Sequence, residues 1–207
     1  MTDQVTTSSS ATTSPSSFFV SLSKQELTLI AAGLAVSGTI SCLAFYAAGI
    51  AKVSVHAFCM STAFGFFFPT AYMLLVRRHP LGRQLHVKLN AIGGCLASVG
   101  YLLSCHYPDG SDSSIAFMHR VTGNVIMLMV LFQAVTALAA LRNDMPQALR
   151  TLFTSAHAPV GKTVLVISLS SIWFTVIWWK SISSLIWIVL VSLEIAILGI
   201  GLWSGKE

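Results

Sequence analysis

The chain has 207 residues, of which 55% are hydrophobic and only 9% are charged, and its net charge is +5. Water-soluble domains carry about a quarter charged residues, so this composition excludes an ordinary soluble globular domain. The mean hydropathy of +0.77 agrees. We therefore expect an integral membrane protein with lipid as its surroundings. In such a chain the basic excess reports orientation in the bilayer, and no nucleic-acid partner is expected.

The first 24 residues differ from the rest. They contain the low-complexity run TTSSSATTSPSS, which offers little apolar surface to bury and predicts a disordered cytoplasmic tail. The segment has no basic start followed by a short apolar core, so it does not resemble a cleaved signal peptide. The chain thus divides into a tail over residues 1–24 and a membrane domain over 25–207, whose first helix would act as an uncleaved anchor.

Six charge-poor runs follow along the chain. A membrane-spanning helix needs about 20 apolar residues, and helices pair every backbone group without water. The runs are Leu27–Ala51, Val53–Val76, Leu89–Tyr107, Val121–Leu141, about 155–179 with Lys162 near its start, and about 181–203. We predict an all-α bundle of six transmembrane helices. Glu194, within the last run, should be neutral or held by a structural hydrogen bond.

The distribution of Lys and Arg predicts the orientation. With six spans, both termini share one side of the membrane with the loops after the second and fourth helices. That side collects Lys24, Arg77, Arg78, Arg83, Lys88, Arg142, Arg150, Lys162 and Lys206, whereas the other has Lys52, Arg120 and Lys180. The positive-inside rule then puts both termini in the cytoplasm. We expect a multi-pass protein of the plasma membrane or an endomembrane.

Four histidines lie near the starts of predicted helices: His56, His86, His119 and His157. The second and fourth helices run in the same direction, so His56 and His119 should share one depth on the non-cytoplasmic side. The third and fifth run the other way, which places His86 and His157 together on the cytoplasmic side. A single intramembrane histidine is often only hydrogen-bonded to a neighbouring helix, but four at matched depths predict two histidine pairs near opposite faces.

Two imidazoles from facing helices suit a b-type haem, whose iron takes two axial ligands and whose ring packs between helices. Zinc would need three or four converging ligands. The four cysteines, expected to be small buried hydrophobes, form no CxxC pair. A proton relay stays open as an alternative, although it does not require level pairs. Because two axial histidines leave no open position on the iron, one-electron transfer is expected rather than oxygen activation.

Four segments carry a resemblance to a known family. They read HAFCMSTAFGFFFPTAYMLLVRRH, LHVKLNAIGGCLASVGYLL, HRVTGNVIMLMVLFQAVTALAAL and HAPVGKTVLVI, in that order. Over about residues 52–179 the chain resembles the cytochrome b561 family. The resemblance implies two haem b groups, one held by His56 and His119 and one by His86 and His157. It also implies electron transfer from a cytoplasmic reductant such as ascorbate to monodehydroascorbate or a ferric chelate, as a transmembrane oxidoreductase.

Further candidates surround these histidines. Arg77, Arg78 and Arg83 would bind an anionic donor or a haem propionate, or would only reflect the positive-inside rule. Lys88 and Lys162 lie within five residues of a cytoplasmic histidine, where they would pair with a propionate or an ascorbate-like anion or extend to the interface. By the resemblance to the ascorbate-using members of the family, His106 is a candidate near the acceptor site.

Two other functions remain open from the sequence. The chain could be a haem-binding relay subunit or anchor of a larger membrane complex, without a substrate site of its own. It could also be a membrane transporter with proton-linked histidines and no haem. The expected partners are the lipid bilayer and a small-molecule electron donor and acceptor, and a homodimer or a larger membrane complex stays open.

Overall fold

The computed structural model describes residues 24–48, 52–76, 78, 80–105, 114–142 and 144–178. Every regular element in these ranges is a helix, which confirms the all-helical architecture. In chain order the elements are α2 (Lys24–Ala48), α3 (Lys52–Thr62), the π-helix η1 (Ala63–Phe67), α4 (Phe68–Val76), α5 (Gly82–Ser104), α6 (Ser114–Leu141) and α7 (Gln147–Trp178).

Three of the described helices are long and apolar enough to cross a membrane. They are Lys52–Val76, which joins α3, η1 and α4, Gly82–Ser104, and Ala116–Ala140. Together with the apolar composition, these helices indicate a membrane protein that contacts lipid. Except for Lys24, the predicted N-terminal tail lies outside the described residues, as does the predicted sixth helix with Glu194.

The observed helices begin earlier than the apolar runs suggested. The helix α5 begins at Gly82 rather than Leu89, and α6 begins at Ser114 rather than Val121. The helix α7 begins at Gln147, so the prediction that His157 lies near a helix start was wrong. In α5 and α7 the helix continues through partly polar turns outside the apolar run, where water or headgroups can solvate the side chains. In α6 the added turns include Ala116, Phe117 and Met118, so Arg120 interrupts an apolar helix and does not mark its start.

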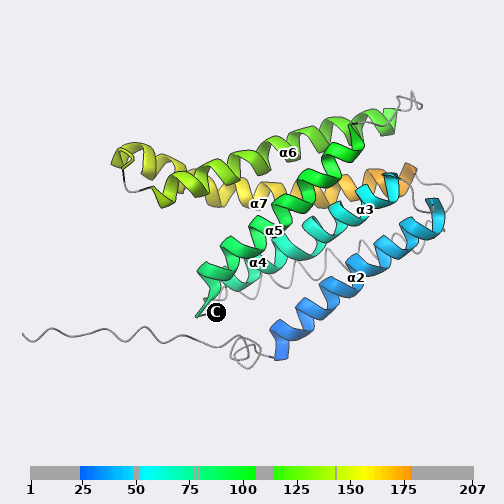
Figure 1. Cartoon of the computed structure of the whole chain (residues 1–207), viewed down its shortest axis with the longest axis horizontal. Coiled ribbons are helices and arrows are strands. Elements are labelled where there is room, and N and C mark those ends of the chain that lie inside the picture. Colours follow the sequence, from blue (N-terminus) through cyan, green and yellow to red (C-terminus); the bar gives the residue numbers. More distant parts are fainter. Residues whose placement is uncertain are drawn as a thin grey trace, which may run out of the picture.

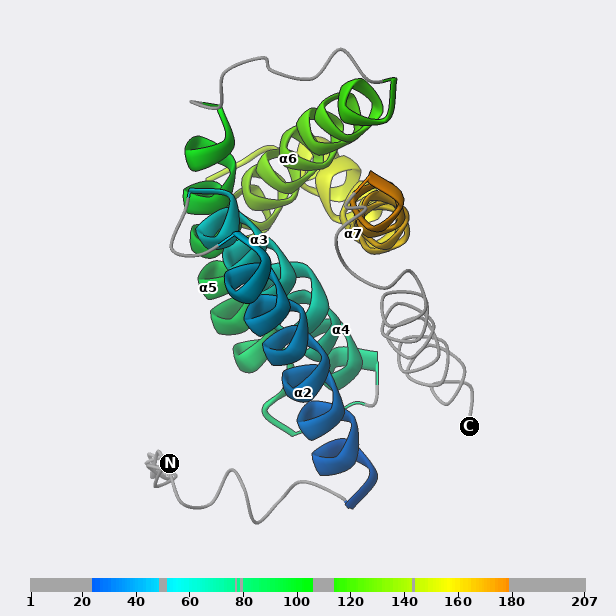
Figure 2. The same cartoon turned by 90° about the vertical axis from the view of Figure 1, so that its right-hand side faces the viewer.

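The helices form two groups, which Figures 1 and 2 show from two sides. In one group α6 and α7 lie side by side, and in the other α2, the α3–η1–α4 helix and α5 pack together. The groups meet where α5 contacts α6 and where η1 contacts α7. Each group is therefore tightly packed within itself, while the two groups touch along a narrower seam.

A hydrophobic core cluster fills this seam near the middle of the helices. Its buried residues come from η1, α4, α5, α6 and α7: Ala63, Phe64, Phe68, Ala97, Ile126, Val164 and Leu165. The rings of Phe64 and Phe68 pack edge to face with their centroids 5.1 Å apart. The cluster holds the two groups together and provides a dry layer between the two ends of the bundle.

The π-helix follows from a proline. Pro69 has no N–H, and its ring would collide with the carbonyl four residues earlier in a regular α-helix. The chain responds with a wider turn, in which the N–H of Phe68 donates to the carbonyl of Ala63. Single π-turns of this kind relieve strain without ending a helix, so α3 and α4 continue as one span.

Two glycines allow α5 to pack closely against this span. A Cβ atom added to Gly93 would lie 2.8 Å from Cε1 of Phe68, and one added to Gly100 would lie 3.0 Å from Cβ of Cys59. Side chains at these positions would force the helices apart. Small residues at such crossings are typical of helix pairs in membranes.

Hydroxyl groups join α2 to α3. The Ser37 hydroxyl donates to the Ser61 carbonyl at 3.1 Å, and the hydroxyls of Ser41 and Ser61 lie 3.1 Å apart. All three side chains are buried. Because lipid offers no hydrogen-bonding partners, such contacts stabilise helix association within the membrane, and α2 is fixed against the span that carries His56.

Candidate functional site

The structure brings the four histidines together in two pairs. His56 on α3 and His119 on α6 have ring centroids 6.3 Å apart, with ring planes at 82°. His86 on α5 and His157 on α7 have centroids 6.2 Å apart, with planes at 74°. Each pair takes one histidine from each helix group. We refer to them as the 56/119 pair and the 86/157 pair.

The Nδ1 atoms of two histidines face backbone carbonyls. Nδ1 of His56 lies 2.8 Å from the carbonyl oxygen of Gly100, and Nδ1 of His86 lies 3.1 Å from that of Ala71. A carbonyl can only accept a hydrogen bond, so Nδ1 must carry the proton in both neutral rings. The lone pair is then on Nε2, which is the nitrogen that can coordinate a metal.

The other two histidines face hydroxyls. Nδ1 of His157 lies 2.9 Å from Oγ1 of Thr136, and Nδ1 of His119 lies 3.4 Å from Oγ of Ser171. Thr136 also donates its hydroxyl proton to the Gln133 carbonyl at 3.0 Å. A hydroxyl has only one proton to donate, so Thr136 must accept from the Nδ1–H of His157. His157 therefore also has its lone pair on Nε2.

These contacts follow a reciprocal pattern. The α3–η1–α4 span and α5 each orient the other's histidine through a backbone carbonyl. The helices α6 and α7 each orient the other's histidine through a hydroxyl. Each of these four helices, with α3–η1–α4 taken as one, thus carries a histidine of one pair and, toward its other end, the polar atom that orients a histidine of the other pair.

The two pairs are well separated along the bundle. Gly100, at the level of His56, follows His86 by 14 residues on α5, and Ser171, at the level of His119, follows His157 by 14 residues on α7. At 1.5 Å per helical residue, both intervals correspond to about 21 Å. This fits within the roughly 30 Å hydrocarbon core of a bilayer, and the hydrophobic core cluster lies between the pairs.

The spacing within each pair matches two imidazoles on one metal ion. With metal–nitrogen bonds of about 2 Å, and about 1.1 Å from each nitrogen to its ring centre, the two centroids would lie roughly 6.3 Å apart. The observed 6.3 and 6.2 Å agree with this value. Within the ranges that the structure describes, no three His, Cys, Asp or Glu side chains converge on a point, which disfavours a tetrahedral zinc site there.

Glycines lie one turn after two of the histidines. Gly123 follows His119 on α6, and Gly161 follows His157 on α7, so each shares a helix face with its histidine. A Cβ atom added to Gly123 would meet no atom within 4 Å, and one added to Gly161 would touch only Gln133, from 3.5 Å. The space beside Gly123 is therefore open, whereas Gly161 packs against the side chain of Gln133.

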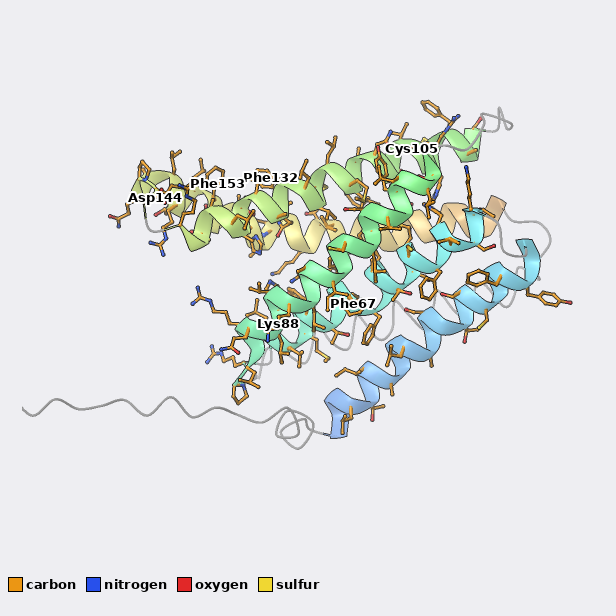
Figure 3. The ribbon with its side chains drawn as sticks, viewed as in Figure 1. Phe67, Lys88, Cys105, Phe132, Asp144 and Phe153 are labelled. Atoms are coloured by element: carbon orange, nitrogen blue, oxygen red, sulfur yellow. The ribbon has the colours of Figure 1, made fainter. Side chains whose placement is uncertain are left out.

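The predicted basic residues lie on the surface. Arg78, Arg83, Lys88 and Lys162 are all exposed. Lys88 lies near the start of α5, at the end opposite Cys105 (Figure 3). Arg78 adopts a left-handed backbone with φ of 53°, and its N–H donates to the Leu75 carbonyl at 3.1 Å, so it closes the end of α4. Arg77 and His106 lie outside the described residues.

The cysteines differ in part from the prediction. Cys59 is buried, as expected, but Cys42, Cys95 and Cys105 are exposed, and all four are free thiols. Cys42 and Cys95 lie on apolar helices, where lipid rather than protein can cover a weakly polar thiol. Cys59 packs against Gly100, whose carbonyl faces His56, but among the described residues no cysteine joins a histidine pair as a third metal-binding side chain.

The polar partners of the histidines were missed from the sequence. Thr136 and Ser171 are buried hydroxyl residues, and Thr136 lies in an apolar stretch of α6, where its hydroxyl was a usable signal. The partners of His56 and His86 are the backbone carbonyls of Gly100 and Ala71. No side chain marks such an acceptor, so it appears only once the helices are placed.

Comparison with known proteins gives one match. Residues 46–141 match the family described as "Domain of unknown function (DUF2427)". The matched region is less than half of the chain and includes His56, His86 and His119, but it ends before His157. No curated protein and no solved structure matches the chain. The function therefore has to be argued from the geometry.

Proposed function

We propose that this chain is a transmembrane electron-transfer protein, whose 56/119 pair and 86/157 pair would each hold one b-type haem. The observation that carries the proposal is the spacing of 6.3 and 6.2 Å between facing imidazole centroids. It is supported by the carbonyl and hydroxyl contacts at Nδ1, which orient Nε2 as the coordinating nitrogen. These features favour two separate two-ligand centres over one polynuclear site.

The surroundings of the pairs suit such a group. The open space at Gly123 leaves room for a flat ring beside His119. The apolar residues around Phe64 and Phe68 keep water out of the middle of the bundle. A haem held by two histidines would supply one-electron chemistry, and the chain's own contribution would be to hold, orient and insulate two such groups.

The wider proposal draws on the resemblance to the cytochrome b561 family. We propose six membrane helices with both termini in the cytoplasm, so that the 86/157 pair lies on the cytoplasmic side. Electrons would pass from a cytoplasmic reductant, such as ascorbate, to a non-cytoplasmic acceptor, such as monodehydroascorbate or a ferric chelate. The exposed Lys88 and Lys162, close in sequence to His86 and His157, favour an anionic reductant.

The alternative is a relay subunit or anchor that receives electrons only from a partner protein. The exposed Lys88 and Lys162 favour direct reduction by a small anion over reduction by a partner protein. Reduction of the purified chain by ascorbate therefore distinguishes the two functions. Purified chain mixed with ascorbate should show the absorption bands of reduced haem within seconds to minutes. A chain that binds haem but is not reduced by any small reductant would have the relay function instead.

The first test is haem content. The purified full-length chain should contain two haems, measured by the pyridine haemochrome assay against protein concentration, with a low-spin spectrum in both redox states. A ratio near one or zero would contradict the proposal. Zero would leave the histidines to a proton-linked function in a transporter.

A further inference from the structure

Thr136 occupies an unusual position beside the 86/157 pair. Its side chain has no solvent exposure and is among the largest fully buried side chains of the described residues. Its hydroxyl lies between Nδ1 of His157 at 2.9 Å and the Gln133 carbonyl at 3.0 Å. The residue therefore links the imidazole on α7 to the backbone of α6.

We propose that Thr136 is a positioning residue, which fixes the tautomer and ring orientation of His157 and lowers the reduction potential of the centre at the 86/157 pair. This inference rests on the proposed function, since it concerns a haem bound there. Thr136 would not touch the haem iron itself, and would act only through the imidazole of His157.

The proton count supports the tautomer. The hydroxyl proton of Thr136 goes to the Gln133 carbonyl, an i−3 contact that also fixes the Thr136 rotamer. The hydroxyl oxygen then offers only lone pairs to His157. The ring must keep its proton on Nδ1 to satisfy this contact. Nε2 is thereby left unprotonated and directed away from α6.

Gln133 provides a second hold on the same residue. Its side-chain Nε2 donates to the His157 carbonyl at 2.7 Å. This contact lies close to Pro159, which removes one helical hydrogen bond from α7 and weakens the helix locally. The backbone and the ring of His157 are thus both held by contacts from a single turn of α6.

An acceptor on Nδ1–H changes the electron donation of the ring. When Nδ1–H donates a hydrogen bond, the imidazole becomes a more basic ligand through Nε2. A more basic ligand stabilises the oxidised iron and so lowers the reduction potential, and such outer hydrogen bonds are one means by which proteins adjust haem potentials. The corresponding contact at the other pair, from His119 to Ser171, is longer at 3.4 Å, and a longer contact has less influence.

The test is a spectroelectrochemical redox titration of the haem-loaded full-length chain with three variants. Thr136→Val keeps the shape of the side chain but removes the hydroxyl, and should shift one of the two midpoint potentials upward and change the electron paramagnetic resonance signal of that centre alone. Thr136→Ser keeps the hydroxyl and should leave both potentials near their wild-type values. Ser171→Ala is the matched control, and should shift the other centre by a smaller amount.

Each outcome decides the inference. Unchanged potentials in Thr136→Val would overturn the inference. Equal shifts in Thr136→Val and Thr136→Ser would also overturn it, because altered packing at this position, and not loss of the hydroxyl, would then be responsible. If Thr136→Val loses one haem while Thr136→Ser keeps both, positioning by the hydroxyl is supported, whereas loss in both variants overturns it. Wild-type chain without haem would refute the proposed function and this inference with it, but two haems with unmoved potentials would refute the inference alone.

Discussion

At the scale of single residues, most of the chemistry depends on which atom faces each histidine. The residue types were visible in the sequence, and their pairing followed from helix direction and depth alone. The atoms that face the histidines could not be predicted in the same way, because two of them are backbone carbonyls. A helix presents its carbonyls to a neighbour only when a small residue such as Gly100 lets the two backbones approach, and sequence patterns do not report that distance.

Arg78 gives a prediction about stability at this scale. Its left-handed backbone, with φ of 53°, costs a residue with a Cβ atom roughly 1 kcal/mol relative to glycine. Arg78→Gly should therefore raise the free energy of unfolding by up to about 1 kcal/mol, measured by denaturant titration in detergent. Arg83→Gly is the control, since Arg83 lies in the first turn of α5, where glycine brings no such relief. Destabilisation by Arg78→Gly would show that the arginine side chain matters more than the backbone.

Lys88 and Lys162 give a prediction about the electron donor. If these lysines attract an anionic reductant, the double variant Lys88→Gln and Lys162→Gln should be reduced more slowly by ascorbate. The second-order rate of haem reduction should fall on the order of tenfold at low salt, and by less at high salt, where charges are screened. Stopped-flow absorbance measures this rate. The control is Lys52→Gln, because Lys52 is exposed near the start of α3, toward the 56/119 pair. Equal rates in all three proteins would mean that these lysines only reach the membrane interface.

At the scale of helices, the apolar runs predicted which segments are helical but not where the helices begin. The helices α5 and α6 each start seven residues before the apolar run that predicted them. In α5 the added turns are partly polar and remain helical outside the apolar layer, whereas in α6 the apolar residues resume before Arg120. The π-turn was not predicted either. Its cause, Pro69, is plain in the sequence, but a proline in a long apolar segment is equally compatible with a kink.

The fit of α5 against α4 gives a prediction for a matched pair of glycines. Gly93→Ala would place a Cβ atom 2.8 Å from Phe68, whereas Gly94→Ala would meet nothing within 4 Å. Overpacking at the first site should cost about 1–3 kcal/mol of unfolding free energy. The variant Gly94→Ala should leave the unfolding free energy unchanged, or raise it by up to about 1 kcal/mol through the higher helix propensity of alanine. Unfolding in detergent, followed by circular dichroism, compares the two. Similar values for both variants would contradict the close packing of α5 on Phe68.

At the scale of the whole molecule, two helix groups are joined by a hydrophobic core cluster, with a histidine pair on either side of it. The sequence predicted this symmetry because helix polarity and histidine depth are both linear properties of the chain. The orientation in the membrane is a separate matter, and it rests on the bias in Lys and Arg.

Orientation can be tested by labelling. In a variant without native cysteines, Ser111→Cys lies in the segment between α5 and α6, which the positive-inside rule assigns to the non-cytoplasmic side. An impermeant thiol reagent should label it in intact cells, if the chain resides in the plasma membrane. Arg150→Cys, near the start of α7, is the control and should react only after permeabilisation. The reverse pattern would exchange the sides of the two pairs.

The central claim is that the four histidines form two independent haem centres with the pairing seen in the structure. Redox titration of four single variants, each with one histidine replaced by alanine, tests it most directly. His56→Ala and His119→Ala should deplete the same low-spin centre, and His86→Ala and His157→Ala should deplete the other. If His56→Ala and His157→Ala instead removed one and the same centre, while the other two variants spared it, the pairing would be wrong.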